Sequence, residues 1–276
     1  MTVNTLSRPS RGLCPLVLIT VVAGMLLGTV NRADAQWVTY PTPHTPRLAN
    51  GKPNLAAPTP RINGKPDLSG IWVRVEPRVP PDPNPIGPNL RDYMPAGAVI
   101  PMRPAAERLY RERSTKLGAG RPSQRCLPHS IPDAMLPGAL IKFVQNPELT
   151  ILLYEEFNHF RQIFTDGRPL PAVSQPAWFG YSVGKWEGDT FVVQTSGFND
   201  ESWLDDWGLP HTEAMRTIER FRRTDFGHMQ MEVTIDDPEA YTKPWSAVVR
   251  FDLRPDTELI EDICDNETDS AHIEAK

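Results

Sequence analysis

The chain has few of the residues on which common metal and catalytic sites are built. Its 6 histidines are scattered, without a His-x-His or a His-Glu-x-x-His pair, so the sequence predicts no metal site. It contains no Gly-x-Ser-x-Gly elbow and no glycine-rich phosphate loop, which argues against hydrolases of that type, dinucleotide enzymes and NTPases. We therefore expect a protein that needs no cofactor.

Basic residues are scarce toward the carboxyl end. From Ser196 onward, 8 Lys and Arg residues stand against 20 Asp and Glu residues, a net charge of 8 − 20 = −12. This charge would repel a polyanion, so nucleic acid is not an expected partner. Four of the acidic residues lie within 200–206, where a calcium loop is conceivable. Their spacing matches no EF-hand, and a solvated acidic loop is the preferred interpretation.

The chain also lacks an apolar run long enough to cross a membrane comfortably. Residues 16–30 are apolar, follow Arg8 and Arg11, and precede the small-x-small sequence Ala33-Asp34-Ala35. This pattern predicts a signal peptide over residues 1–35, and hence a periplasmic or secreted protein with no stable membrane span after cleavage. A retained membrane anchor is the alternative.

Cysteine is rare, with 3 residues in all, and cleavage would remove Cys14. Cys126 and Cys264 would remain, an even number in an oxidising compartment. We expect a disulfide bond that ties the proline-rich region to the end of the chain. The alternative is a pair of free, buried thiols.

Proline is abundant, but it is unevenly distributed. Residues 36–140 contain 20 of the 30 prolines, and the run at 80–85 should be extended and polyproline-like. We interpret residues 36–138 as a proline-rich arm. It carries a first strand at about 70–76 and a surface helix at about 104–117, with proline at its first position and Gly118 at its end.

Residues 139–276 alternate between apolar and polar side chains in short runs separated by turn signals, as in Met229, Met231, Val233 and Ile235. A period of two with one apolar face predicts antiparallel strands, half buried against a core. About nine strands in an up-and-down meander would close into a barrel, so we expect a mainly β domain. The runs are 140–145, 150–157, 160–164, 179–187, 190–198, 216–224, 229–235, 246–253 and 258–264.

Two resemblances add to this interpretation. Gly70-Ile71-Trp72, at the first strand, resembles the Gly-x-Trp signature of lipocalins, whose Trp closes one barrel end beneath a late Arg. That resemblance implies a lipocalin-like, calycin-type barrel, with Arg250 or Arg254 stacked on Trp72. The lipocalin pattern is interrupted here, because some seventy residues separate Trp72 from the next strong strand.

The second resemblance covers most of the chain. The blocks Gly64-Lys65-Pro66-Asp67-Leu68-Ser69-Gly70, 160–168 (FRQIFTDGR), 186–190 (WEGDT) and 236–242 (DDPEAYT) are similar to blocks in a group of uncharacterised exported bacterial proteins, common in soil organisms such as acidobacteria. The group has no assigned reaction, so the resemblance implies export and carries over no catalytic residue.

Acid–base chemistry is the catalytic option that the sequence leaves open. A His or a partly buried carboxylate beside an Arg can hold a pKa suited to proton transfer. Such groups occur near one hairpin and on the strand that follows His211, where Glu219 alternates with apolar residues and should point inward. Turn residues and surface ion pairs are the alternative interpretation. The candidates are His159, Arg161, His211, Glu213 and Glu219.

Aromatic residues near strand ends favour a site for an apolar or aromatic small molecule, although plain core packing explains many of them. The candidates are Phe157, Trp178, Tyr181, Phe198, Trp203 and Trp245. The first functional hypothesis is therefore an exported barrel that binds such a molecule. The second is a cofactor-free lyase, isomerase or hydratase on the same barrel, and the third is a cell-envelope interaction module that uses the proline-rich arm.

Overall fold

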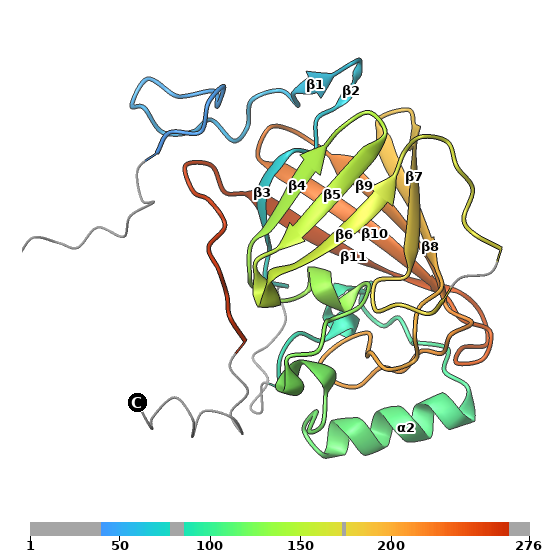
Figure 1. Ribbon diagram of the computed structural model, residues 1–276. Coiled ribbons are helices and arrows are strands. Elements are labelled where there is room, and N and C mark those ends of the chain that lie inside the picture. Colours follow the sequence, from blue (N-terminus) through green and yellow to red (C-terminus); the bar gives the residue numbers. More distant parts are fainter. Residues whose placement is uncertain (1–39, 78–85, 173–174, 265–276) are drawn as a thin grey trace, which may run out of the picture. The chain divides into compact units, whose positions relative to one another are not determined.

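Nine strands close into a barrel within the part of the chain that the computed structural model describes, residues 40–77, 86–172 and 175–264 (Figure 1). These residues belong to a unit that begins at Thr39. The expected signal peptide and the proline run at 80–85 lie outside the described residues. The barrel strands are β3 (Gly70–Arg74), β4 (Ile141–Gln145), β5 (Leu149–Tyr154), β6 (His159–Phe164), β7 (Tyr181–Glu187), β8 (Thr190–Ser196), β9 (Arg216–Arg223), β10 (His228–Asp236) and β11 (Trp245–Leu253).

Each barrel strand pairs with the next one along the chain, and β11 pairs with β3 to close the ring. The expected mainly β, lipocalin-like barrel is thus confirmed. One junction departs from the antiparallel meander, because β6 and β7 pair in parallel through Ile163 and Phe164. Residues 165–180 join these two strands, and a connection of this length is enough for the crossover that parallel strands need.

The predicted alternation is clearest in β10 and β11, where every second side chain is buried. Met229, Met231, Val233 and Ile235 are each at most 2% exposed, so the apolar face of β10 points into the barrel as the sequence indicated. Burial of such side chains is the main favourable term for closing the sheet.

The prediction of a last strand at residues 258–264 is wrong, because this segment has no regular secondary structure. The free edge of β11 is instead occupied by β3, through the pairs Phe251–Arg74 and Leu253–Trp72. Once that edge is paired, residues 258–264 have no ladder to join. The barrel therefore takes its ninth strand from the proline-rich part of the chain.

Trp72 is buried in the barrel, but its cationic partner differs from the expected one. The side chain is fully buried, and its indole nitrogen donates to the carbonyl of Leu68 at 3.0 Å. The guanidinium of Arg223, on β9, lies 4.9 Å from the ring centroid. Arg250 and Arg254 were the predicted partners, and that prediction is wrong. Arg223 alternates with Phe221 and Glu219, so the inward face of β9 carries it into the barrel.

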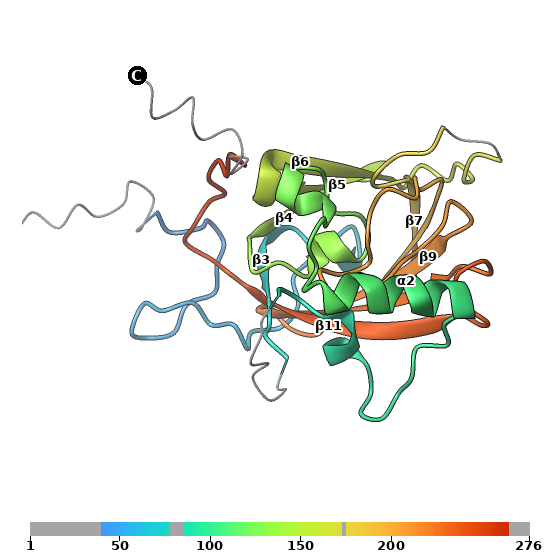
Figure 2. The ribbon, with the colours of Figure 1, turned by 90° about the horizontal axis from the view of Figure 1, so that it is seen from below.

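The helix α2 (Pro104–Thr115) lies at one end of the barrel, together with the short 3-10 helices and the loop between β8 and β9 (Figures 1 and 2). It begins at a proline, as predicted, and carries two i,i+4 ion pairs, Glu107–Arg111 and Glu112–Lys116. Arg113 of α2 stacks on Trp203 at 4.4 Å, which fixes the helix on the β8–β9 loop.

The other short elements are β1 (Arg61–Ile62), β2 (Lys65–Pro66), η1 (Leu90–Tyr93), η2 (Pro122–Arg125), η3 (Asp133–Met135) and η4 (Glu156–Asn158). The segment around η3 covers the barrel end, since Ile131, Met135 and Leu136 are fully buried. A disulfide bond joins Cys126, just before this cover, to Cys264. The predicted pairing is confirmed, and it ties the cover to the segment that follows β11.

Candidate functional site

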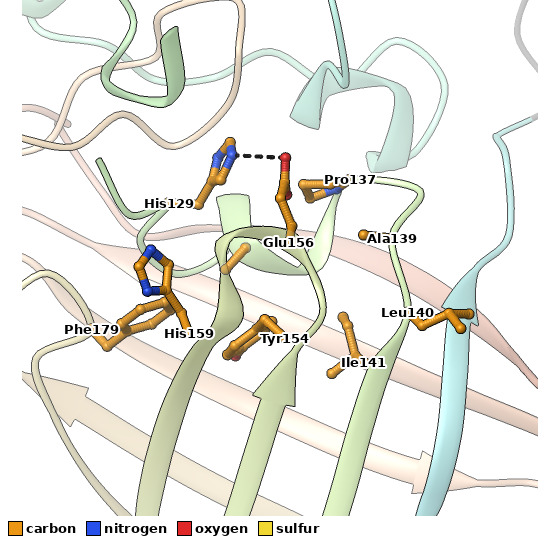
Figure 3. A pocket seen from close by; sticks show the side chains of 10 residues that line it. His129, Pro137, Ala139, Leu140, Ile141, Tyr154, Glu156, His159 and Phe179 are labelled. Atoms are coloured by element: carbon orange, nitrogen blue, oxygen red, sulfur yellow. Dashed lines mark ion pairs between the residues drawn. The ribbon is translucent and has the colours of Figure 1, made fainter. Parts of the chain in front are cut away.

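A narrow pocket opens at the covered end of the barrel, between the strand ends of β4, β5 and β6 and the segment around η3 (Figure 3). Its free space is about 10 Å³, enough for about one water molecule. Three strand ends supply its walls, because β4 begins, β5 ends and β6 begins at this end of the barrel. The lining residues are His129, Ala134, Pro137, Ala139, Leu140, Ile141, Tyr154, Glu156, His159 and Phe179.

One wall of the pocket is aromatic. Tyr154 and Phe179 are stacked, with ring centroids 5.4 Å apart and planes 16° from parallel. His159 meets Phe179 edge-on at 6.1 Å. Tyr154 and His159 are directly paired in the β5–β6 register, so both side chains leave the sheet on the same face. A flat apolar group could extend this stack.

The opposite wall is polar. His129 Nε2 and Glu156 Oε1 are 3.4 Å apart across the pocket rim (Figure 3). The Nε2 atom of His159 is buried and has no hydrogen-bond partner among the described residues. A buried nitrogen without a partner costs free energy, and such an atom in a pocket wall is a natural contact for a polar group of a ligand.

The two pocket histidines have pKa values shifted in opposite directions. Burial lowers the pKa of His159, and the positive charge of His129 lowers it further, so His159 is neutral at pH 7. Burial also opposes protonation of His129, but Asp133, through charge and a hydrogen bond, and Glu156 outweigh burial and raise its pKa well above the ordinary value. Burial raises the pKa of Tyr154, which stays a neutral phenol.

A buried ion pair lies beneath the aromatic wall, inside the barrel. Arg161 Nη1 and Nη2 donate to the two carboxylate oxygens of Glu219 at 3.0 and 2.5 Å. The same guanidinium donates to Ser182 Oγ at 3.0 Å and to Thr195 Oγ1 at 2.8 Å. Both charged side chains are at most 1% exposed. With all its partners satisfied, this network links β6 to β9 across the barrel interior.

Behind His129 lies a group of buried carboxylates. His129 Nδ1 is 2.5 Å from Asp133 Oδ2, and one ligand atom from each of His129, Asp133 and Asp206 falls within 4.8 Å of the others. Burial and the charge of Asp133 raise the pKa of Asp206 to about 7, against the opposing charges of His129 and Arg121. These three side chains could hold a cation.

The sequence suggested a solvated acidic loop, but two of its four acidic side chains are turned away from solvent. Asp205 is fully buried and accepts hydrogen bonds from the backbone amides of Leu90 and Leu209, each at 3.0 Å. Burial raises its pKa to about 7. Asp200 and Glu201 do remain exposed. Two of the four acidic side chains thus fold inward against the barrel cover.

The structure separates the catalytic candidates of the sequence into three places. His159 lines the pocket, and Arg161 and Glu219 form the ion pair beneath it. His211 is buried elsewhere, with Nε2 2.6 Å from Ser202 Oγ and Nδ1 3.2 Å from the carbonyl of Thr212. Glu213 is exposed.

The aromatic candidates do not converge on the pocket. Phe157 comes nearest, stacked on His129 with ring centroids 5.7 Å apart. Phe198, Trp203 and Trp245 are buried by packing elsewhere in the fold, and Trp178 is half buried. Tyr181 is 38% exposed at the start of β7.

Sequence reasoning missed four of the residues that shape the site, namely His129, Tyr154, Glu156 and Phe179. Tyr154 could have been found, because it follows Thr150 and Leu152 in the alternation of β5. Glu156 begins the single turn of η4, and His129 and Phe179 lie in irregular segments, so no periodic pattern shows which way these side chains point.

The fold and the site define a closed barrel with a small, partly polar pocket at one covered end. No protein-family model matches the chain, and a comparison with curated proteins finds no match. Among the described residues, no helix is long and apolar enough to cross a bilayer.

Proposed function

We propose that this protein is an extracytoplasmic barrel that binds a small, flat, mainly apolar molecule bearing one hydrogen-bonding group. The disulfide bond between Cys126 and Cys264 supports a location outside the cytoplasm, where such bonds persist. The observation that carries the binding proposal is the Tyr154–Phe179 stack beside the buried, unpartnered Nε2 of His159.

The pocket is nearly closed in the structure. Its free space is about 10 Å³, which is room for about one water molecule. An apolar cavity that binds benzene has a volume of about 150 Å³. We therefore expect the half-buried side chain of Phe179 to move aside when a single ring carrying a hydroxyl or carbonyl group enters beside His159.

The test is a screen of phenols and aromatic ketones by ligand-observed NMR, followed by titration of the hits. Phe179→Ala removes half of the aromatic stack and should weaken binding about tenfold, because aromatic pairs contribute roughly 0.5–1.5 kcal/mol beyond the area that they bury. His159→Phe removes the polar contact and should weaken the hydroxyl-bearing hits more than their unsubstituted parent rings.

Phe160→Ala is the matched control, since Phe160 neighbours His159 on β6 but is 61% exposed. It should bind like the unmodified protein. If the Phe179→Ala and His159→Phe variants both bind the hits with the affinity of the unmodified protein, the ligand lies elsewhere and the proposal is overturned.

Acid–base catalysis in the same pocket is the second candidate, and the lowered pKa of His159 favours it. A neutral imidazole with a free Nε2 can accept a proton from a bound C–H or O–H group. The reaction classes are those of a cofactor-free lyase, isomerase or hydratase.

The discriminating assay is exchange of α-protons in the bound ketones against D₂O, followed by NMR. Catalysis predicts that His159→Gln slows exchange by about a hundredfold or more while the barrel stays folded. If the protein binds the ketones saturably but α-proton exchange is no faster than in buffer, the function of the pocket is binding alone.

A further inference from the structure

A second, distinct site lies behind the pocket, where His129 meets the carboxylates of Asp133 and Asp206. His129 and Asp133 stand four residues apart in the segment that covers the barrel, and Asp206 comes from the loop between β8 and β9. One ligand atom from each of these residues lies within 4.8 Å of the other two. Any two ligands of a tetrahedral zinc ion lie about 3.4 Å apart at bond lengths of about 2.1 Å, so side-chain movements of about 1 Å would place all three on one ion.

The burial of these groups points to a missing positive partner. Asp133 is 5% exposed, and its Oδ1 atom is buried without a hydrogen-bond partner among the described residues. An ionised carboxylate oxygen left in this state is costly unless a cation or a donor meets it. The other oxygen, Oδ2, is already in contact with His129.

The surrounding charges do not remove this imbalance. Asp205 and Asp206 add two carboxylates from the β8–β9 loop, and Glu156 adds a third on the pocket side. Arg121 approaches Asp206 with Nε 3.4 Å from Oδ1, which is long for a charge-assisted hydrogen bond. Buried charged groups in proteins are paired or coordinate a metal ion, so this group of carboxylates is a candidate cation site.

We propose that His129 Nδ1 and the carboxylates of Asp133 and Asp206 bind one divalent first-row metal ion, Zn²⁺ or Mn²⁺. A nitrogen ligand beside two carboxylates suits these ions better than Ca²⁺ or Mg²⁺, which prefer oxygen ligands alone. Binding requires a neutral imidazole, so any proton on Nδ1 is released to the solvent as the metal–nitrogen bond forms.

The remaining ring nitrogen of His129 has no hydrogen-bond partner among the described residues, but it faces the kind of group that a metal site would need. Metal-bound histidines usually donate their second N–H to a carboxylate, which fixes the ring orientation. His129 Nε2 faces Glu156 Oε1 at 3.4 Å, and Glu156 lines the pocket (Figure 3). The ion would therefore hold the pocket wall in place, and it would join the barrel cover to the β8–β9 loop. This inference does not depend on what the pocket binds.

The test uses the whole mature chain, stripped of metal with a chelator and then titrated separately with Zn²⁺, Mn²⁺, Ca²⁺ and Mg²⁺. We expect one equivalent of Zn²⁺ or Mn²⁺ by calorimetry and by elemental analysis after dialysis. At about 100 times the dissociation constant, the bound ion should raise the melting temperature by roughly 5–10 °C.

Asp206→Asn and Asp133→Asn should each weaken Zn²⁺ and Mn²⁺ binding at least a hundredfold. Asp200→Asn is the matched control, since it is the same substitution at an exposed position of the same loop. It should keep full affinity. The measurement on the unmodified chain stands even if a ligand variant fails to fold.

Two results would overturn the proposal. One is a stripped, folded chain that takes up less than a tenth of an equivalent of either ion and melts at the same temperature with and without them. The other is Zn²⁺ or Mn²⁺ binding that survives both the Asp133→Asn and the Asp206→Asn substitutions, which would place the ion elsewhere on the chain. Tighter binding of Ca²⁺ than of Zn²⁺ and Mn²⁺ would also contradict the proposal, because Ca²⁺ prefers oxygen ligands and His129 supplies a nitrogen.

Discussion

Replacing Glu219 by Gln should destabilise the barrel strongly, because it leaves the charge of Arg161 buried without its counter-ion. The two side chains are at most 1% exposed and share two hydrogen bonds. Removing one partner of a buried ion pair typically costs roughly 3–5 kcal/mol, most of it the penalty of the unpaired charge. Ser182 and Thr195 still accept from the guanidinium, and their hydroxyls cannot neutralise it.

A control variant at an exposed ion pair separates the cost of the buried, unpaired charge from the cost of losing a carboxylate. Lys142 and Glu258 form an ion pair at the same 2.5 Å distance, but their side chains are 32% and 50% exposed. The same substitution there, Glu258→Gln, should cost no more than about 1 kcal/mol, since water screens exposed pairs. Both variants replace Glu by Gln in an ion pair, and they differ in whether that ion pair is buried.

The assay is urea unfolding followed by tryptophan fluorescence, with the free energy extrapolated to water. A loss of 3–5 kcal/mol in Glu219→Gln corresponds to roughly 6–20 °C in melting temperature for a domain of this size. The double variant Arg161→Met with Glu219→Leu should recover much of the loss, because it removes both buried charges. Equal stability of Glu219→Gln and Glu258→Gln would refute the reasoning.

Three further predictions concern other parts of the fold. Replacing Cys126 and Cys264 by Ser removes a link across 138 residues, and it should lower the free energy of unfolding by roughly 4–5 kcal/mol in urea titrations under non-reducing conditions. Trp72→Ala empties a fully buried site beneath the guanidinium of Arg223, and it should cost roughly 3–5 kcal/mol in the same assay, whereas Trp72→Phe should cost less. Burial lowers the pKa of His211, so this residue binds fewer protons in the folded than in the unfolded chain below pH about 6.5. Its contribution to the free energy of unfolding should therefore fall as the pH drops below about 6.5, whereas the raised pKa values of Asp205 and Asp206 act in the opposite direction. In urea titrations from pH 7.5 to 5, His211→Gln should gain stability relative to the unmodified protein as the pH falls.

Much of the barrel could be predicted because alternation is a local signal. Side chains two residues apart in a strand share a face, so the pattern of β9 indicated that Glu219 points inward. The same rule places His159 and Arg161 on one face of β6. The sequence could not show that Arg161 and Glu219 meet, because β6 and β9 come together only when the sheet curls.

The site was less predictable for a related reason. His129 and Phe179 belong to segments without regular structure, where neither a period of two nor one of 3.6 indicates a direction. Their positions depend on how the cover and the connection between β6 and β7 fold over the barrel end. The sequence pointed to aromatic residues near strand ends, but the pocket uses Phe179 and not its neighbour Trp178.

By itself, the amino-acid sequence determined most of the strands and their turns, the helix that begins at Pro104 and the pair of cysteines able to form a disulfide bond, because each is encoded in neighbouring or countable residues. Only the tertiary structure decided which strand closes the ring, which arginine covers Trp72, and which acidic side chains are buried. Those outcomes depend on contacts between residues far apart in the chain, and strand register and chain closure fix such contacts for the whole barrel at once.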